Sequence, residues 1–143
     1  MTTSPPSRSP GTPGSDGADA SRGTILVVED ESALRRLVTR MLRRMGFETL
    51  EAKDGREGLA LARTAGSDLD MILSDVVMPE LSGPDMAEML RGDGFAVPVA
   101  FMSGYSGEEL SGADRHTHFL AKPFTMGELG DFVSSVLEER NGP

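Results

Sequence analysis

Acidic, hydroxyl and basic residues follow directly after short apolar segments of the chain, and their types could do chemistry. They are Glu29 and Asp30, Ser74 and Asp75, Ser103, and Lys122. In a parallel sheet, the residues after each strand gather at one edge, which is where ligands bind. Three carboxylates and one ammonium group would give this edge a charge of −2. One divalent cation would neutralise it.

Oxygen is the only ligand atom that these acidic side chains offer. An all-oxygen set favours a hard cation such as Mg²⁺ over zinc or copper. Mg²⁺ commonly takes one or two carboxylates and completes its shell with water and a phosphoryl oxygen. The residues therefore predict a site for Mg²⁺-dependent phosphoryl transfer.

Apolar segments are the expected strands of the sheet that positions these residues. We expect strands over residues 24–28, 47–52, 71–73, 96–102 and 119–121, of which 47–52 is the weakest. Continuous apolar character suits strands that are buried on both faces. Helix-period segments alternate with them, which predicts an α/β fold with a parallel sheet and helices on both sides.

Helices are expected over residues 34–45, 54–65, 84–91 and 125–137. Gly46 stands where a C-terminal cap belongs, and Pro84 suits the first helical position. Capping-box spacing marks two helix starts, at Asp54 with Glu57 and at Thr125 with Glu128. The segment 104–118 is Gly-rich and polar, so any helix there is short.

Charge and composition exclude several classes of function. The 143 residues carry a net charge of −9 and no cysteine, which removes disulfides, thiolate metal sites and thiol nucleophiles. No apolar stretch is long enough to span a bilayer and no signal peptide is present, so we expect a cytoplasmic protein without membrane insertion. An acidic chain without a basic patch predicts no nucleic-acid partner.

Residues 1–23 differ from the rest of the chain. Sixteen of these 23 residues are Gly, Pro, Ser or Thr, and their charges sum to zero. Such a segment cannot bury enough surface to offset its ordering entropy, so we interpret it as a disordered tail. One domain over residues 24–140 follows, with 141–143 as the C-terminal end.

The motifs around the predicted site resemble the receiver domain of two-component response regulators. The segments that carry the resemblance are 25–31 (ILVVEDE), 71–79 (MILSDVVMP), 101–104 (FMSG) and 122–124 (KPF). They are most similar to receivers of hybrid histidine kinases and stand-alone regulators. The resemblance implies a flavodoxin-like (CheY-like), doubly wound, five-stranded parallel sheet of order 2-1-3-4-5.

Roles for the acidic residues follow from the resemblance. It implies that Asp75 accepts the phosphoryl group from a phosphohistidine. Asp30, Asp75 and the backbone carbonyl of Val77 would hold Mg²⁺, and Glu29 would bind it directly or through water. The predicted donor is a histidine kinase or histidine phosphotransfer protein.

Further residues would control the switch that the resemblance implies. Lys122, expected before a cis proline, would pair with Asp75 and then with the phosphoryl oxygens, to which Ser103 would donate a hydrogen bond. Movement of Ser103 would let Phe119 fill the vacated space. The face around the fourth helix, fifth strand and last helix would then bind a downstream protein or pass the group on.

Departures from the family pattern carry expectations of their own. Val77 and Tyr105 flank the expected path of attacking water and are poorly suited to orient it, so we expect slow hydrolysis. The segment between Ser103 and Lys122 is short for the family, which predicts a curtailed fourth helix. The oligomeric state, a monomer or a phosphorylation-dependent dimer, stays open.

Two alternatives remain beside the receiver, which would not be an enzyme beyond its own phosphorylation and dephosphorylation. The first is a Mg²⁺-dependent phosphohydrolase, although such enzymes commonly need a second acid where Val77 stands. The second is an interaction domain that works without phosphorylation, against which the complete set of acidic, hydroxyl and lysine residues speaks.

Overall fold

Residues 21–104 and 118–141 are described by a computed structural model, and within them five strands form one sheet. The strands are β1 (Thr24–Val28), β2 (Glu48–Ala52), β3 (Met71–Asp75), β4 (Val99–Ser103) and β5 (His118–Ala121). Each neighbouring pair is parallel, and the order is β2-β1-β3-β4-β5. The predicted sheet order is confirmed.

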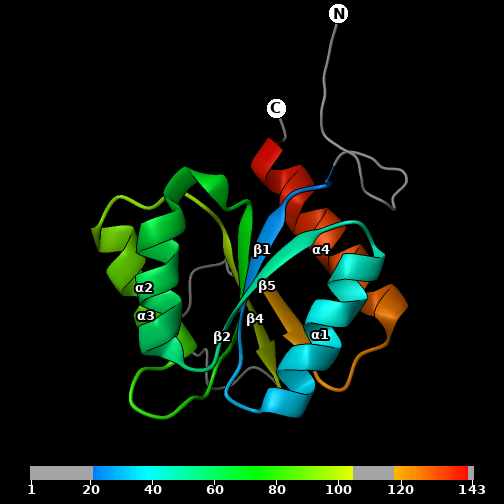
Figure 1. Ribbon diagram of the computed structural model, residues 1–143, viewed down its shortest axis with the longest axis horizontal. Coiled ribbons are helices and arrows are strands. Elements are labelled where there is room, and N and C mark those ends of the chain that lie inside the picture. Colours follow the sequence, from blue (N-terminus) through cyan, green and yellow to red (C-terminus); the bar gives the residue numbers. More distant parts are fainter. Residues whose placement is uncertain (1–20, 105–117, 142–143) are drawn as a thin grey trace, which may run out of the picture.

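Helices cover both faces of this sheet. They are α1 (Ser32–Arg44), α2 (Gly55–Ala65), α3 (Gly83–Gly92) and α4 (Met126–Asn141), with a short 3₁₀ helix, η1 (Gly66–Asp68), after α2. The helices α2 and α3 lie on one side of the sheet, and α1 and α4 on the other (Figure 1). Among the described residues no helix has the length and apolar character needed to cross a membrane.

The core consists of two apolar layers that share the central strands. Ile25 and Val27 of β1 pack with α1 and α4, whereas Leu26 and Val28 pack with α2 and α3. Successive strand residues point to opposite faces, so a strand covered on both sides must be apolar throughout. This explains why β1 is a continuous apolar run. Because β1 is packed on both faces, its carboxyl end has a fixed position at the edge of the sheet.

Local capping sets the helix starts largely as predicted. The hydroxyl oxygen of Thr125 accepts a hydrogen bond from the Glu128 N–H at 3.0 Å, and the Glu128 carboxylate accepts one from the Thr125 N–H at 2.8 Å. Ser82 caps α3, so Gly83 is its first residue and Pro84 its second. The helix therefore begins one residue earlier than the sequence predicts.

The strand ends differ from the predicted ranges in a way that matters for the site. β4 begins at Val99 rather than residue 96, because Pro98 has no N–H for the ladder. β3 continues to Asp75, which pairs with Met102, and β4 ends at Ser103. The polar residues of these two strands are thus the last residues of strands rather than residues of the following loops, which fixes their backbone positions.

Parts of the predicted termini lie outside the described residues. These parts are 1–20 and 142–143, and the expected short helix after Ser103 also falls outside, in 105–117. Arg22 and Gly23, which the sequence assigns to the tail, are described and extend the β1–β2 pairing through Gly46 and Glu48. The rest of the tail remains a prediction.

Candidate functional site

Three carboxylates and one ammonium group meet at the carboxyl edge of the sheet. Carboxylate oxygens of Glu29, Asp30 and Asp75 lie within 4.8 Å of one another. The Lys122 Nζ, which follows β5, is 3.2 Å from Glu29 Oε1 and 3.2 Å from Asp75 Oδ1. Residues far apart in the sequence are brought together because parallel strands end at the same edge.

The side chains of this cluster differ in their exposure to solvent. The side chain of Glu29 is 2% exposed and that of Asp75 is 13% exposed, whereas Asp30 is exposed. Val77, two residues after β3, is 59% exposed. A ligand from solvent would therefore reach the cluster over Asp30 and Val77.

Hydrogen bonds hold the two buried carboxylates in different ways. Both oxygens of Glu29 are engaged, because Oε1 faces Lys122 and Oε2 accepts a hydrogen bond from the Glu31 N–H at 3.0 Å. Asp75 accepts bonds from the Val76 N–H at 2.9 Å and from Lys122, both through Oδ1. Its Oδ2 is left without a hydrogen-bond donor from the described residues.

Electrostatics leave the acidic cluster short of positive charge. Burial raises the pKa of Glu29 and the pKa of Asp75 above their ordinary values, although Lys122 opposes the rise at both carboxyls. Burial lowers the pKa of Lys122, but the Asp75 and Glu29 carboxylates outweigh it and the net shift is upward. Lys122 therefore stays charged, and a second cation would favour ionisation of both acids.

The donor set fits a hard divalent cation. Three carboxylates offer oxygen atoms only, within reach of one ion, and their charge exceeds that of Lys122 by two. The exposed rim leaves room for water or a phosphoryl oxygen in the same coordination shell. Binding of the ion through the backbone carbonyl of Val77 stays a prediction.

The end of β3 packs closely against a glycine that the sequence analysis does not single out. The Gly83 N–H donates to the Val76 carbonyl at 2.9 Å, and a Cβ on Gly83 would collide with the backbone carbonyl oxygen of Asp75. The Ser74 hydroxyl also donates to that oxygen, at 2.8 Å. In the sequence, Ser82-Gly83-Pro84 indicates only the start of a helix. The close approach of Gly83 to β3 is a tertiary contact, and no local sequence pattern signals it.

Arg35 is a second residue that sequence reasoning misses. Its Nη1 donates to the backbone carbonyl of Glu29 at 2.8 Å, and its Nε pairs with Glu51 Oε1 at 3.2 Å. The side chain is only 16% exposed. It ties the end of β1, which carries Glu29 and Asp30, to β2. The two partners lie 6 and 16 residues away, so no local spacing signals the contact.

The predicted switch residues lie on neighbouring strands. Ser103 is 1% exposed, and its carbonyl accepts a hydrogen bond from the Lys122 N–H at 2.7 Å. Phe119 stands opposite Phe101 in the β4–β5 register and packs on the small cluster that Phe101 forms with Val76 and Ala87. Tyr105 lies outside the described residues. The Lys122–Pro123 peptide bond is cis.

Comparison of the sequence with known families finds one clear match. The profile described as "Response regulator receiver domain" matches residues 25–134. The sensor kinase CckA of Brucella abortus is 36% identical over 121 residues, which is 82% of this chain and 13% of the kinase. Other relatives are named as transcriptional regulatory proteins, and the chain spans about half of their lengths. The absence of a nucleic-acid partner therefore stays a prediction.

Solved structures agree with the sequence comparison. The receiver domain of the hybrid histidine kinase CckA matches with a TM-score of 0.69 and 40% identity, over 80% of this chain and 99% of that domain. The response regulator TrrA of Thermotoga maritima, solved in complex with Mg(2+)-BeF, matches with a TM-score of 0.68 and 28% identity. That match covers 80% of this chain and 98% of the solved one.

Proposed function

Because the chain belongs to the response regulator receiver domain family, we propose that Asp75 is the residue at which it accepts a phosphoryl group. The family is a signalling domain that serves two-component and phosphorelay systems. The observation that carries the assignment to Asp75 is its place in the site. It is the acidic residue that both ends a central strand and contacts Lys122, and one of its oxygens is left open.

In the proposed transfer, the open Oδ2 of Asp75 attacks the phosphorus as the bond to the donor imidazole breaks. The N–H of Val76 and the ammonium of Lys122 hold Oδ1, so the carboxylate cannot rotate away. Lys122 lies within reach of the incoming phosphoryl oxygens. Positioning and fixed charge supply most of the effect, because a carboxylate is a weak nucleophile.

We propose that Glu29, Asp30 and Asp75 hold Mg²⁺, with the backbone carbonyl of Val77 as a further ligand. The bound ion would neutralise charge on the transferring phosphoryl group. Asp30 and Asp75 are the direct ligands in this proposal. Glu29, whose two oxygens already accept hydrogen bonds, would contribute through water.

Output is proposed to pass through the face near β5. Phosphorylation of Asp75 would draw in the Ser103 hydroxyl and let Phe119 turn into the space that it leaves. The position of Phe119 against Phe101 and Val76 supports this role, because the ring already lies at the edge of the β3–β4 core. The changed face would bind a downstream protein, or a histidine that receives the phosphoryl group. The chain itself would act as a monomer or as a phosphorylation-dependent dimer.

The donor in this proposal is a histidine kinase or a histidine phosphotransfer protein. We infer that the domain catalyses only its own phosphorylation and dephosphorylation. Val77 stands where a phosphohydrolase would need its second acid, and its exposed aliphatic side chain cannot activate water. The same feature supports slow loss of the phosphoryl group once it is attached.

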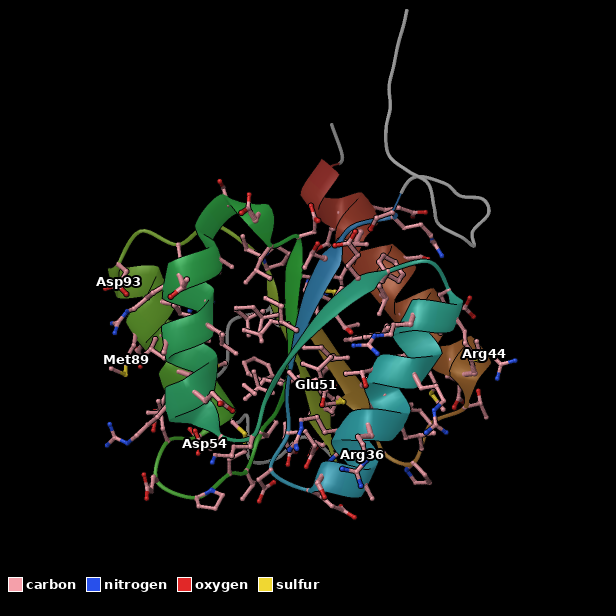
Figure 2. All side chains as sticks on the ribbon, in the orientation of Figure 1. Arg36, Arg44, Glu51, Asp54, Met89 and Asp93 are labelled. Carbon is pink, nitrogen blue, oxygen red and sulfur yellow. The ribbon has the colours of Figure 1, made fainter. Side chains whose placement is uncertain are left out.

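Binding of beryllofluoride, a phosphoryl mimic, tests this proposal. We expect Mg²⁺-dependent changes in the backbone amide NMR signals around β3 and β5 in the wild type, and none in Asp75→Asn. Asp93→Asn, which replaces an exposed aspartate at the C-terminal end of α3 (Figure 2), is the matched control and should respond as the wild type does. A response that survives in Asp75→Asn refutes the assignment, and turnover of added phosphate esters would favour the phosphohydrolase instead.

A further inference from the structure

Helix α1 concentrates positive charge in an otherwise acidic chain. Its 13 residues contain five arginines, at positions 35, 36, 40, 43 and 44, and neither an acid nor a lysine. The helix therefore carries +5, and because the whole chain carries −9, all other residues together carry −14. The expectation that the chain lacks a basic patch is wrong at this helix.

Four of these arginines line one hollow beside the sheet. Arg36, Arg40, Arg43 and Arg44 surround a groove of about 350 Å³, which Thr39 and Glu51 complete. Figure 2 labels Arg36 near the start of α1, Arg44 at its end, and Glu51 on β2 beside the helix. We call this hollow the arginine groove. Its lining residues come from α1 and β2, and neither Asp75 nor Lys122 is among them.

The charges of the arginine groove are not neutralised by the described residues. Glu51, the acid in the lining, is already paired with Arg35 at 3.2 Å. Arg43 donates to the neutral hydroxyl of Thr49 at 2.8 Å. Within the described part of the chain, Arg36, Arg40 and Arg44 have no carboxylate partner.

Like charges repel along one side of α1 as a result. Arg36, Arg40 and Arg44 follow one another at i, i+4 spacing, which puts neighbouring guanidinium groups on the same helix face. The helix does not need them for its core packing, since Val38 and Leu42 point into the apolar layer and the three arginines are exposed. A bound anion would turn this repulsion into attraction.

The lining indicates which kind of anion would fit. Guanidinium forks match phosphate oxygens in pairs, and a groove of this volume falls in the range of small-ligand sites. No apolar or aromatic side chain of the described residues lines it, in contrast to the apolar centre of protein interfaces. Four arginines and one glutamate give the lining a charge of +3, which suits a ligand with several negative charges on few atoms.

We propose that the arginine groove binds a small diffusible anion that carries more than one phosphoryl group. The site is separate from the phosphorylation pocket and independent of the role of Asp75. Charge-assisted hydrogen bonds from Arg36, Arg40 and Arg44 would hold the phosphoryl oxygens. Affinity should fall with rising salt, because the groove is open to solvent.

Calorimetric titration of the full chain with tripolyphosphate, in EDTA without Mg²⁺, tests the proposal. We expect one saturable site in the wild type and a loss of affinity of about tenfold or more in Arg40→Gln, the size of effect that follows loss of a charge-assisted hydrogen bond. Arg63→Gln is the matched control, because Arg63 lines another groove and pairs with Asp93 at 2.8 Å. It should bind as the wild type does.

Four results would overturn the proposal. One is the absence of saturable binding to the wild type, and another is an equal loss in Arg63→Gln, which would mean a response to overall charge. The third is loss of binding in Lys122→Met with full binding in Arg40→Gln, which would place the anion in the phosphorylation pocket. Citrate or an acidic peptide that binds as tightly as tripolyphosphate would likewise refute recognition of phosphoryl groups. Amide NMR shifts of wild-type α1 on titration give a readout that needs no variant.

Discussion

Replacing Asp75 with asparagine should stabilise the folded protein when no divalent cation is present. The substitution is nearly isosteric, and the amide oxygen can still accept the hydrogen bonds that Val76 and Lys122 donate to Oδ1. What the change removes is one negative charge from a buried cluster. The size of the effect on stability can be calculated from the distances in the site.

Coulomb's law gives the balance of attraction and repulsion at Asp75. With an effective dielectric constant of about 20, two like charges at 4.8 Å, the upper limit of the separations in this cluster, repel by about 3.5 kcal/mol, which is the contribution of the buried Glu29. Asp30 is exposed, so solvent screens its repulsion and it adds much less. The Lys122 ammonium at 3.2 Å attracts by about 5 kcal/mol on the same scale. Repulsion and attraction therefore nearly cancel, and the cost of burying the carboxylate decides the sign, in line with the raised pKa of Asp75.

The effect depends on pH in a defined direction. Burial raises the folded-state pKa of Asp75 above its unfolded value, so the folded state holds the proton more tightly. The carboxyl therefore destabilises the fold least below the unfolded pKa, and stability declines as pH rises through the folded value. The stability difference between Asp75→Asn and the wild type should be absent in acid and should grow as pH rises above about 4.

Thermal unfolding in EDTA and in Mg²⁺ measures this prediction. In EDTA at neutral pH we expect Asp75→Asn to melt above the wild type, by about 2–4 °C for each kcal/mol. Mg²⁺ should raise the Tm of the wild type more than that of the variant, because the ion binds the intact cluster. Asp93→Asn, at an exposed ion pair, should change stability little. A variant that melts below the wild type in EDTA, or a difference that does not change with pH, would refute the charge balance.

Four further predictions concern the residues around the site. Gly83→Ala should destabilise the protein by about 1–3 kcal/mol in denaturant unfolding, because the added Cβ meets the Asp75 carbonyl; unchanged stability would show that the loop can yield. Arg35→Met should weaken Mg²⁺ binding about tenfold in titration, since the support of the Glu29 carbonyl is lost, and wild-type affinity would make Arg35 merely structural. Phe119→Ala should keep phosphorylation but weaken binding of the downstream partner, and partner affinity that is unchanged in both phosphorylation states would remove Phe119 from the switch. Val77→Asn should speed decay of the phosphorylated protein by offering an amide to orient water, and an identical decay rate would contradict the lifetime argument.

Elements whose causes are local could be predicted from the sequence. The strands stand out because burial on both faces demands unbroken apolar runs, as in β1. The helix start at Thr125 follows from two side chains three residues apart, which form the reciprocal hydrogen bonds that their spacing predicts. The meeting of Glu29, Asp75 and Lys122 follows from topology, since parallel strands deliver their ends to one edge.

Contacts between elements could not be predicted in the same way. Arg35 reaches the Glu29 carbonyl and Glu51 only because α1 packs over β1 and β2. Gly83 matters because the start of α3 touches the backbone of Asp75, which no spacing rule encodes. The arginines of α1 are visible in the sequence at i, i+4 spacing, but the net charge of −9 hides them from an argument that averages over the chain.

Phosphoryl uptake at Asp75 is the central claim, and intact-protein mass spectrometry tests it most directly. The wild type is incubated with a small acyl phosphate donor and Mg²⁺, beside Asp75→Asn and a wild-type sample in EDTA. We predict that one phosphoryl group is added to the wild type with Mg²⁺ and none to either of the other samples. Equal uptake by Asp75→Asn, or no uptake by the folded wild type with Mg²⁺, would contradict the claim.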